Sequence, residues 1–219
     1  MAVALVIKLS GRVFENEELV LKYVEVLKTV KEKICVITGG GDVARRYIQI
    51  AKRGGASYTF QDLLGIYSSR LNALLLISLL EDAHPEVPTN LQEVLKACRQ
   101  SRIVVTGGLQ PGQSTATVAA LVAEAVKAGV LLNAANIDAV YTDDPRRNPS
   151  AKKIGELKYD DLEKILNSSA LPGGYELLDL WSLAILERNC IITYIFDKDR
   201  PDYILDILRG GNPGSRVTC

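Results

Sequence analysis

The stretch Val3-Ala4-Leu5-Val6-Ile7-Lys8-Leu9, which ends in Ser10-Gly11, decides the fold class of this chain. A continuous aliphatic run of this length is typical of a strand buried on both faces inside a parallel sheet. A helical pattern with apolar residues three and four apart follows at 17–30, and a second short strand is predicted at 34–37. Thr38-Gly39-Gly40-Gly41 then ends that strand. The chain therefore opens as strand, helix and strand.

The alternation of strands and helices continues along the rest of the chain. We predict strands at 103–105, 130–133 and 190–195, and helices at 43–53, 60–81, 91–98, 114–127, 160–166, 175–188 and 203–209. The helix at 60–81 is apolar on more than one side and is expected to be largely buried. This order predicts an α/β fold, a three-layer α/β/α sandwich with a mostly parallel central sheet. At 219 residues, we expect a single domain, 1–219.

The composition excludes several classes of protein. Lys and Arg together number 26, and so do Asp and Glu, so a nucleic-acid-binding basic face is not expected. The start of the chain has no basic segment of a signal peptide, and the apolar run at 74–80 is far shorter than the roughly 20 residues of a membrane span. The cysteines are far apart and form no C-x-x-C pair, which argues against a disulfide framework or a zinc site and favours a reducing cytoplasm. They are Cys35, Cys98, Cys190 and Cys219.

Three glycine-rich turns follow predicted strands, at 10–11, 39–41 and 107–112. Glycine allows positive φ and lets backbone N–H groups approach an anion, and a following helix adds the positive end of its dipole. One such turn is most often only a turn, but three at strand ends suit two phosphate-bearing ligands that meet head to head. The chain has no G-x-x-x-x-G-K-[ST] motif, which excludes a P-loop.

Charged residues near these turns are candidates for catalysis of phosphoryl transfer, which needs cations and backbone amides more than a nucleophile. Lys8 stands near the end of the first strand and either faces the turns or extends to the surface. Arg12 and Arg45 lie close to the first two turns and are placed to bind phosphate. Asp62, at the start of an apolar helix, either caps that helix or contacts a ribose diol.

These residues resemble the UMP kinases of the amino acid kinase fold, and the archaeal branch in particular. Gln-Pro-Gly-Gln-Ser-Thr at 110–115 and Asp-Leu-Leu-Gly-Ile at 62–66 are the specific segments. The resemblance covers essentially the whole chain and includes further matches at 6–11, 38–41, 44–48, 69–73, 105–108, 136, 138, 140–141, 144–145 and 175–179. It implies the carbamate kinase-like form of the predicted fold, in which the N-terminal part binds UMP and forms oligomers and the C-terminal part binds ATP.

The resemblance also implies a role for particular residues. Lys8, Arg12 and Arg45 would be catalytic, with Lys8 facing the phosphates. ATP would be held by Gly11, Arg12, Gly41, Arg45, Ala135, Asn136, Tyr141 and Asp144. UMP would be held by Gly40, Asp62, Gly108, Leu109, Gln110, Pro111, Gly112, Gln113 and Ser114. The family works with Mg²⁺ and forms homohexamers built as trimers of dimers. No side chain is assigned as a direct metal ligand.

Some positions depart from the family pattern and leave alternatives open. Many relatives have Thr-Asn where this chain has Ala135-Asn136, and some have Asp at the position of Thr117, whose role is here vacant or taken by another carboxylate. Asp179-Leu180-Trp181 stands where Asp-Pro-Leu is common. The alternatives are a kinase of the same fold for another acceptor and an inactive nucleotide sensor, because a fold does not prove an activity.

Overall fold

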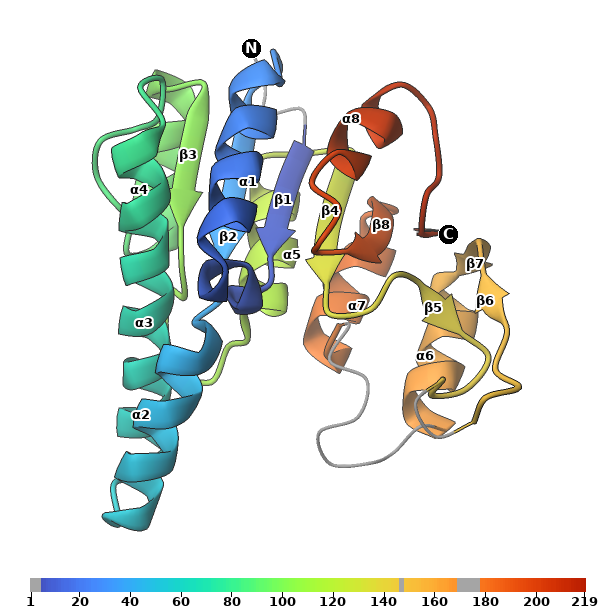
Figure 1. Cartoon of the computed structure of the whole chain (residues 1–219), viewed down its shortest axis with the longest axis horizontal. Coiled ribbons are helices and arrows are strands. Elements are labelled where there is room, and N and C mark those ends of the chain that lie inside the picture. Colours follow the sequence, from blue (N-terminus) through green and yellow to red (C-terminus); the bar gives the residue numbers. More distant parts are fainter. Residues whose placement is uncertain (1–4, 146–147, 169–177) are drawn as a thin grey trace.

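A seven-stranded sheet forms the centre of the molecule in the computed structural model, which describes residues 5–145, 148–168 and 178–219 (Figure 1). The strand order is β3-β2-β1-β4-β8-β9-β7. All neighbouring strands run parallel except β8 and β9, which are antiparallel. The strands are β1 (Leu5–Leu9), β2 (Ile34–Thr38), β3 (Ile103–Thr106), β4 (Val130–Ala135), β7 (Glu156–Lys158), β8 (Ile192–Asp197) and β9 (Ser215–Thr218).

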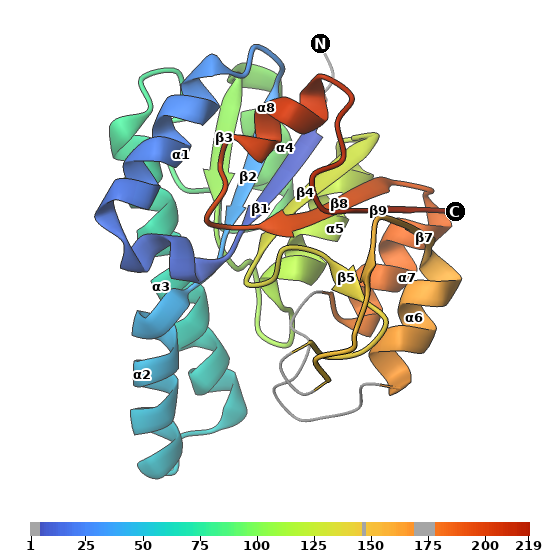
Figure 2. The ribbon, with the colours of Figure 1, turned by 45° about the vertical axis from the view of Figure 1, so that its right-hand side comes forward.

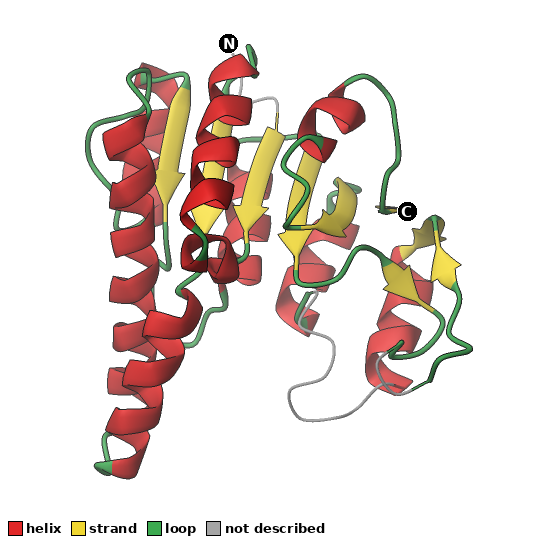
Figure 3. Ribbon diagram, in the orientation of Figure 1, coloured by secondary structure: helices red, strands yellow, loops and turns green. Residues whose placement is uncertain are grey.

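Helices cover both faces of this sheet, which makes three layers (Figure 3). One apolar core joins the sheet to α1 (Glu17–Thr29), α3 (Tyr58–Leu79) and α8 (Tyr203–Leu208). The other core joins it to α4 (Leu91–Gln100), α5 (Thr115–Ala125), α6 (Tyr159–Ser168) and α7 (Leu180–Arg188). Alternate residues of a strand point to opposite faces, so Ile7 belongs to the first core and Val6 to the second. The predicted fold class is confirmed.

The helices α2 (Gly41–Arg53) and α3 form an arm that extends past the sheet (Figures 1 and 2). The prediction that this apolar helix is largely buried is wrong, because only six of the 22 residues of α3 are buried. Its exposed apolar residues explain the misleading pattern. By length and composition alone, α3 is also the one helix in the described ranges that could cross a membrane. The exposed large apolar residues of the arm are Val43, Tyr47, Ile50, Tyr58, Phe60, Tyr67, Leu71, Leu74 and Leu75.

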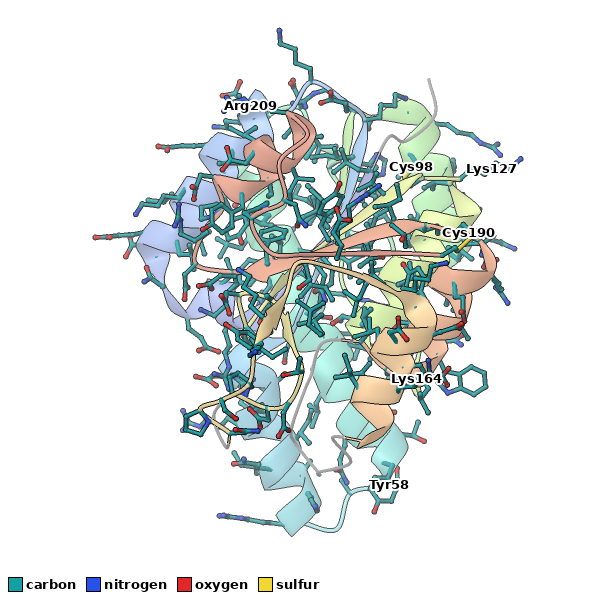
Figure 4. The ribbon with its side chains drawn as sticks, turned by 90° about the vertical axis from the view of Figure 1, so that its right-hand side faces the viewer. Tyr58, Cys98, Lys127, Lys164, Cys190 and Arg209 are labelled. Atoms are coloured by element: carbon teal, nitrogen blue, oxygen red, sulfur yellow. A yellow bond between two sulfur atoms is a disulfide. The ribbon has the colours of Figure 1, made fainter. Side chains whose placement is uncertain are left out.

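A disulfide joins Cys190 to Cys219, with their Cα atoms 5.5 Å apart (Figure 4). The prediction against disulfides is therefore wrong for this pair. The antiparallel register places Thr193 opposite Val217, so a residue just before β8 meets one just after β9. Spacing along the sequence carries no information about such pairing. Cys35 and Cys98 are buried free thiols.

The element boundaries agree with the sequence pattern to within a few residues for the long elements. The structure adds a 3₁₀ turn, η1 (Gly11–Glu15), and a small hairpin of β5 (Val140–Tyr141) and β6 (Lys153–Ile154), none of which was predicted. Strands β7 and β9 were also missed. The start of the predicted first strand at 3–4 and the start of the predicted helix at 175–177 lie outside the described residues. Pro172-Gly173-Gly174, for which the sequence predicts a glycine-rich loop, lies outside them too.

Candidate active site

The first two glycine turns are in direct backbone contact at the carboxyl ends of β1 and β2. A Cβ atom on Gly11 would lie 2.0 Å from Gly41 N and 2.8 Å from Gly39 C. A side chain at position 11 therefore has no room. Gly41 also has a φ of +63°, a left-handed conformation that glycine adopts without strain. Glycine at these positions lets η1 and the start of α2 come together.

Side chains of α3 hold the second turn in place. Thr38 Oγ1 donates to Ser69 O at 2.7 Å, and Asn72 Nδ2 donates to Gly39 O at 2.7 Å. Gly40, the N-cap of α2, is packed so closely that a Cβ would lie 2.5 Å from Ala44 Cβ. Contacts with α3 and hydrogen bonds to it therefore fix the position of the amino end of α2.

The same helix holds the third glycine turn. Gly108 N donates to Ser69 Oγ at 2.8 Å. A Cβ on Gly107 would lie 2.5 Å from Ser69 Oγ and 2.7 Å from Arg70 N, so the turn passes directly over the α3 backbone. Ser69 therefore contacts both β-strand ends, through its carbonyl and through its hydroxyl.

We call residues 108–114 the acceptor segment. Asp62 Oδ2 accepts a hydrogen bond from Gly112 N at 2.8 Å, so the structure brings Asp62 next to this segment. Gln110, Pro111 and Gly112 are exposed, and Gly112 has a φ of +80°. The segment is anchored at its ends and open to solvent in its middle.

Asp179 holds the end of the acceptor segment. Its carboxylate accepts hydrogen bonds from Ser114 Oγ and from Thr117 Oγ1, the latter at 2.8 and 2.9 Å to its two oxygens. It also caps α7 by accepting from Ser182 N at 2.8 Å. Ser114 in turn caps α5, accepting from Ala116 N and Thr117 N at 3.1 and 3.0 Å. One carboxylate therefore ties together the amino ends of α5 and α7.

Arg45 lies in an ion-pair network at the start of α2. Its NH2 group donates to Glu15 Oε1 at 2.9 Å, and its Nε donates to Asp42 Oδ1 at 2.9 Å. Glu15 Oε1 also accepts from Asp42 N at 3.0 Å. The hydrogen bond from Arg45 lowers the pKa of Asp42. A carboxylate thus lies at the amino end of α2, where the helix dipole favours an anion.

The remaining cations flank this network. Arg12 is exposed on η1, next to the first turn. Lys8 is half-buried near the carboxyl end of β1, in register with Ile37 on β2 and Asn133 on β4. By strand alternation Lys8 shares the face of Val6, which α5 covers. Lys8 is therefore a central residue of the sheet, at the end where the glycine turns meet.

The C-terminal candidates lie beyond β4. Ser10 Oγ donates to Asn136 Oδ1 at 2.9 Å, which links the first turn to the residue after buried Ala135. Tyr141 OH donates to Asp138 Oδ1 at 3.0 Å. The pKa of Tyr141 is raised, mainly by burial and to a smaller extent by this hydrogen bond. Asp144 is buried. Of the residues predicted for ATP, Gly11, Gly41, Arg45 and Asn136 are thus joined by contacts at the strand ends, whereas Tyr141 and Asp144 lie on the β5 hairpin.

In the described ranges, no group of three or more His, Cys, Asp or Glu side chains forms a metal cage. Mg²⁺ in nucleotide sites keeps several waters and is bound mainly by phosphates with one or two carboxylates. The residues present fit that mode better than a dedicated metal site.

Sequence reasoning assigned no role to several side chains that shape this site, among them Ser69 and Asn72 of α3. Arg70 and Asp179 bond to the acceptor segment, and Glu15 bonds to Arg45. Arg70 and Asp179 stood within quoted motif segments but had no assigned role. Besides its motif segment, the signal for Arg70 was a cation within a largely apolar helix.

Three comparisons agree on the family. The model of the Amino acid kinase family matches residues 4–197. A uridylate kinase of Pyrobaculum aerophilum is 71% identical over 216 residues, covering 99% of this chain and 100% of the relative, and one of Sulfurisphaera tokodaii is 43% identical over 222 residues, covering 97% and 98%. The crystal structure of uridylate kinase from Archaeoglobus fulgidus superposes with a TM-score of 0.91 at 37% identity, with complete coverage of both chains. The chain belongs to the amino acid kinase family, in the branch of the archaeal uridylate kinases.

Proposed function

We propose that this protein is a UMP kinase that transfers the γ-phosphoryl group of ATP to UMP, giving UDP and ADP. The observation that carries the proposal is the hydrogen bond between Asp62 and Gly112. It joins 62–66 and 110–115, the two segments most specific to the uridylate kinases, in one place. Identity of 71% to a uridylate kinase over nearly the whole chain supports the same activity.

UMP is proposed to bind on the α3 side of the site. Asp62 has a second carboxylate oxygen with free lone pairs, so it accepts from a ribose hydroxyl while it keeps its bond to Gly112. The acceptor segment supplies backbone groups to the uracil and the phosphate, and Gly40 adds the amino end of α2. The amino end of α5 also faces this segment, since Ser114 is its N-cap.

ATP is proposed to bind on the β4 side, against Gly11, Gly41, Ala135, Asn136, Tyr141 and Asp144. Lys8, Arg12 and Arg45 would neutralise charge that develops on the transferred phosphoryl group, which is the main catalytic requirement of this reaction. Arg45 must exchange Glu15 for a phosphate to do so. Mg²⁺ is proposed to arrive with ATP and to screen the phosphate oxygens when bound.

A second copy of the chain is proposed to cover the apolar arm. The exposed residues Phe60, Tyr67, Leu71 and Leu74 recur at helical spacing on one side of α3, and those of α2 add to them. An apolar surface of this kind marks an interface. Such a dimer is the unit from which we propose the homohexamer, a trimer of dimers, and light scattering of the purified protein tests it.

The remaining proposals concern the cell. We propose a cytoplasmic enzyme of pyrimidine nucleotide biosynthesis, with the N-terminal part of a single domain binding UMP and the C-terminal part binding ATP. The Cys190–Cys219 disulfide does not exclude the cytoplasm, because intracellular proteins of hyperthermophilic archaea are rich in disulfides.

An ADP-release assay with ATP and Mg²⁺ tests the function. UMP, CMP, AMP, isopentenyl phosphate and N-acetylglutamate are offered in parallel, and turnover is expected with UMP. Turnover with another acceptor alone would leave the ATP site in place and overturn the proposed acceptor. No turnover with any acceptor, together with nucleotide binding, would identify a sensor.

A further inference from the structure

Arg70 joins two loops to α3. Its Nε donates to Gly108 O at 2.9 Å, and its NH2 group donates to Leu109 O at 3.1 Å. The same NH2 group donates to Thr89 O at 2.8 Å, in the loop that precedes α4. All three acceptors are backbone carbonyls outside regular helices and strands. The planar guanidinium therefore closes on the first two residues of the acceptor segment.

The position of these bonds matters because the acceptor segment is anchored on either side of the exposed residues Gln110 and Pro111. Gly108 N is held by Ser69, the neighbour of Arg70, at 2.8 Å, and Gly112 N is held by Asp62 at 2.8 Å. Arg70 thus bonds to the carbonyl of Gly108 and Ser69 to its N–H, so both backbone polar groups of Gly108 are fixed. This fixes the direction in which the exposed middle of the segment leaves β3.

A fork of this kind is specific to arginine. Hydrogen bonds from a charged donor are roughly twice as strong as neutral ones, and guanidinium presents its donors in a rigid plane. A lysine at the same place offers a point charge and cannot hold Gly108 and Leu109 in the same way. Ordering a loop before a ligand arrives removes that cost from binding.

We propose that Arg70 is a positioning residue that sets the conformation of the acceptor segment for the nucleoside monophosphate. It acts through the carbonyls of Gly108 and Leu109, towards which its donors are turned, and it does not touch the acceptor. The proposal rests on the proposed function, since it takes residues 108–114 as the acceptor site.

The test compares Arg70→Ala and Arg70→Lys with Arg102→Ala. Arg102 is a matched control, because it also donates to a backbone carbonyl, Val30 O, and to Asp82, but at the start of β3. We expect Arg70→Ala to raise the Kd for UMP about tenfold or more, with the Kd for ATP and kcat at saturation within about threefold. Arg70→Lys should fall between Ala and the wild type, and Arg102→Ala should match the wild type.

Amide hydrogen exchange supplies a readout that needs no turnover. The amides of Gly108, Gly112 and the non-proline residues between them should exchange faster in Arg70→Ala and at the wild-type rate in Arg102→Ala. If the wild type fails to bind UMP, the proposed function fails, and exchange still decides whether Arg70 holds the segment. Unchanged exchange, unchanged UMP affinity in Arg70→Ala, or full UMP affinity in Arg70→Lys would overturn the proposal. Melting temperatures identify a variant that does not fold, in which case the lysine variant alone decides.

Discussion

On the acceptor side of the site, the part proposed to bind UMP, side chains of α3 bond directly to the backbone of the glycine turns. On the donor side, the part proposed to bind ATP, charged side chains bond mainly to one another. Ser69 and Asn72 hold Gly108 and Gly39. Arg45, by contrast, is paired with Glu15 and Asp42 on the surface. The backbone proposed to bind UMP is therefore held by α3 before a ligand arrives, whereas Arg45, proposed to bind ATP, would have to change partners.

This difference predicts how each side responds to substitution. When a side chain that bonds to the backbone of a glycine turn is removed, no other group replaces it, and the backbone group is left without a hydrogen-bond partner. Ion pairs between exposed side chains contribute only about 0–1 kcal/mol each, so they exchange at little cost. Substitutions on the acceptor side should thus have larger effects on activity than substitutions on the donor side. The exception is expected where the two sides meet.

Lys8 is that exception, since β1 lies between β2 of the acceptor side and β4 of the donor side. Lys8→Met should lower kcat about 1,000-fold, because it removes a cation that stabilises charge in the transition state. The Kd for UMP should stay within about threefold. Single-turnover kinetics and calorimetric titration measure the two quantities. A kcat close to that of the wild type would remove Lys8 from the catalytic group.

Asp62 gives the next largest effect and separates two roles on the acceptor side. Asp62→Asn keeps an oxygen for Gly112 N but loses the charge offered to the ribose, and should raise the KM for UMP about tenfold. Asp62→Ala also releases Gly112 and should raise it further. The KM for ATP serves as the control. An Asn variant with wild-type KM would show that Asp62 only anchors the segment.

How much of this site could be predicted depended on whether its signals are local. The run at Leu5–Leu9 and the glycines after it report burial and turn geometry directly, so the strand and its turn were predicted correctly. The bonds of Arg70 and Asp179 reach segments 38 and 65 residues away, and their acceptors and donors leave no pattern in the sequence. The short strand at Ser215–Thr218, which lies between β8 and β7 in the sheet, was missed because Val217 is its one apolar residue.

The burial of α3 was mispredicted for a different reason. An apolar side that is exposed on the surface has the same sequence pattern as one that faces the core. Leu71 and Leu76 lie on the same helix, yet Leu71 is 60% exposed and Leu76 is fully buried. Periodicity identifies an apolar side but not what covers it.

Glu15 offers a smaller test on the donor side. Glu15→Gln should lower the KM for ATP by about two- to threefold, because Arg45 then leaves a weaker partner to meet phosphate. The effect should disappear at about 1 M salt, where exposed charges are screened. Asp161→Asn, which removes a surface pair with Lys164 on α6, is the matched control. An increased KM for ATP would show that Glu15 helps the donor site instead of competing for Arg45.

The smallest effect on activity is expected from the disulfide, whose cysteines lie just before β8 and just after β9 and not in any of the three glycine turns. Serine at both Cys190 and Cys219 should leave kcat and both KM values at moderate temperature unchanged. Closing a loop between residues 29 apart stabilises the fold by about 3–4 kcal/mol in the chain-entropy model. For a chain of this size, losing this stabilisation should lower the melting temperature of the double variant by roughly 10 °C.

A reductant provides the control. It should lower the melting temperature of the wild type by the same amount and leave that of the double variant unchanged, since the remaining cysteines, Cys35 and Cys98, are already free thiols. A loss of activity without a loss of stability would instead connect β9 to the donor side.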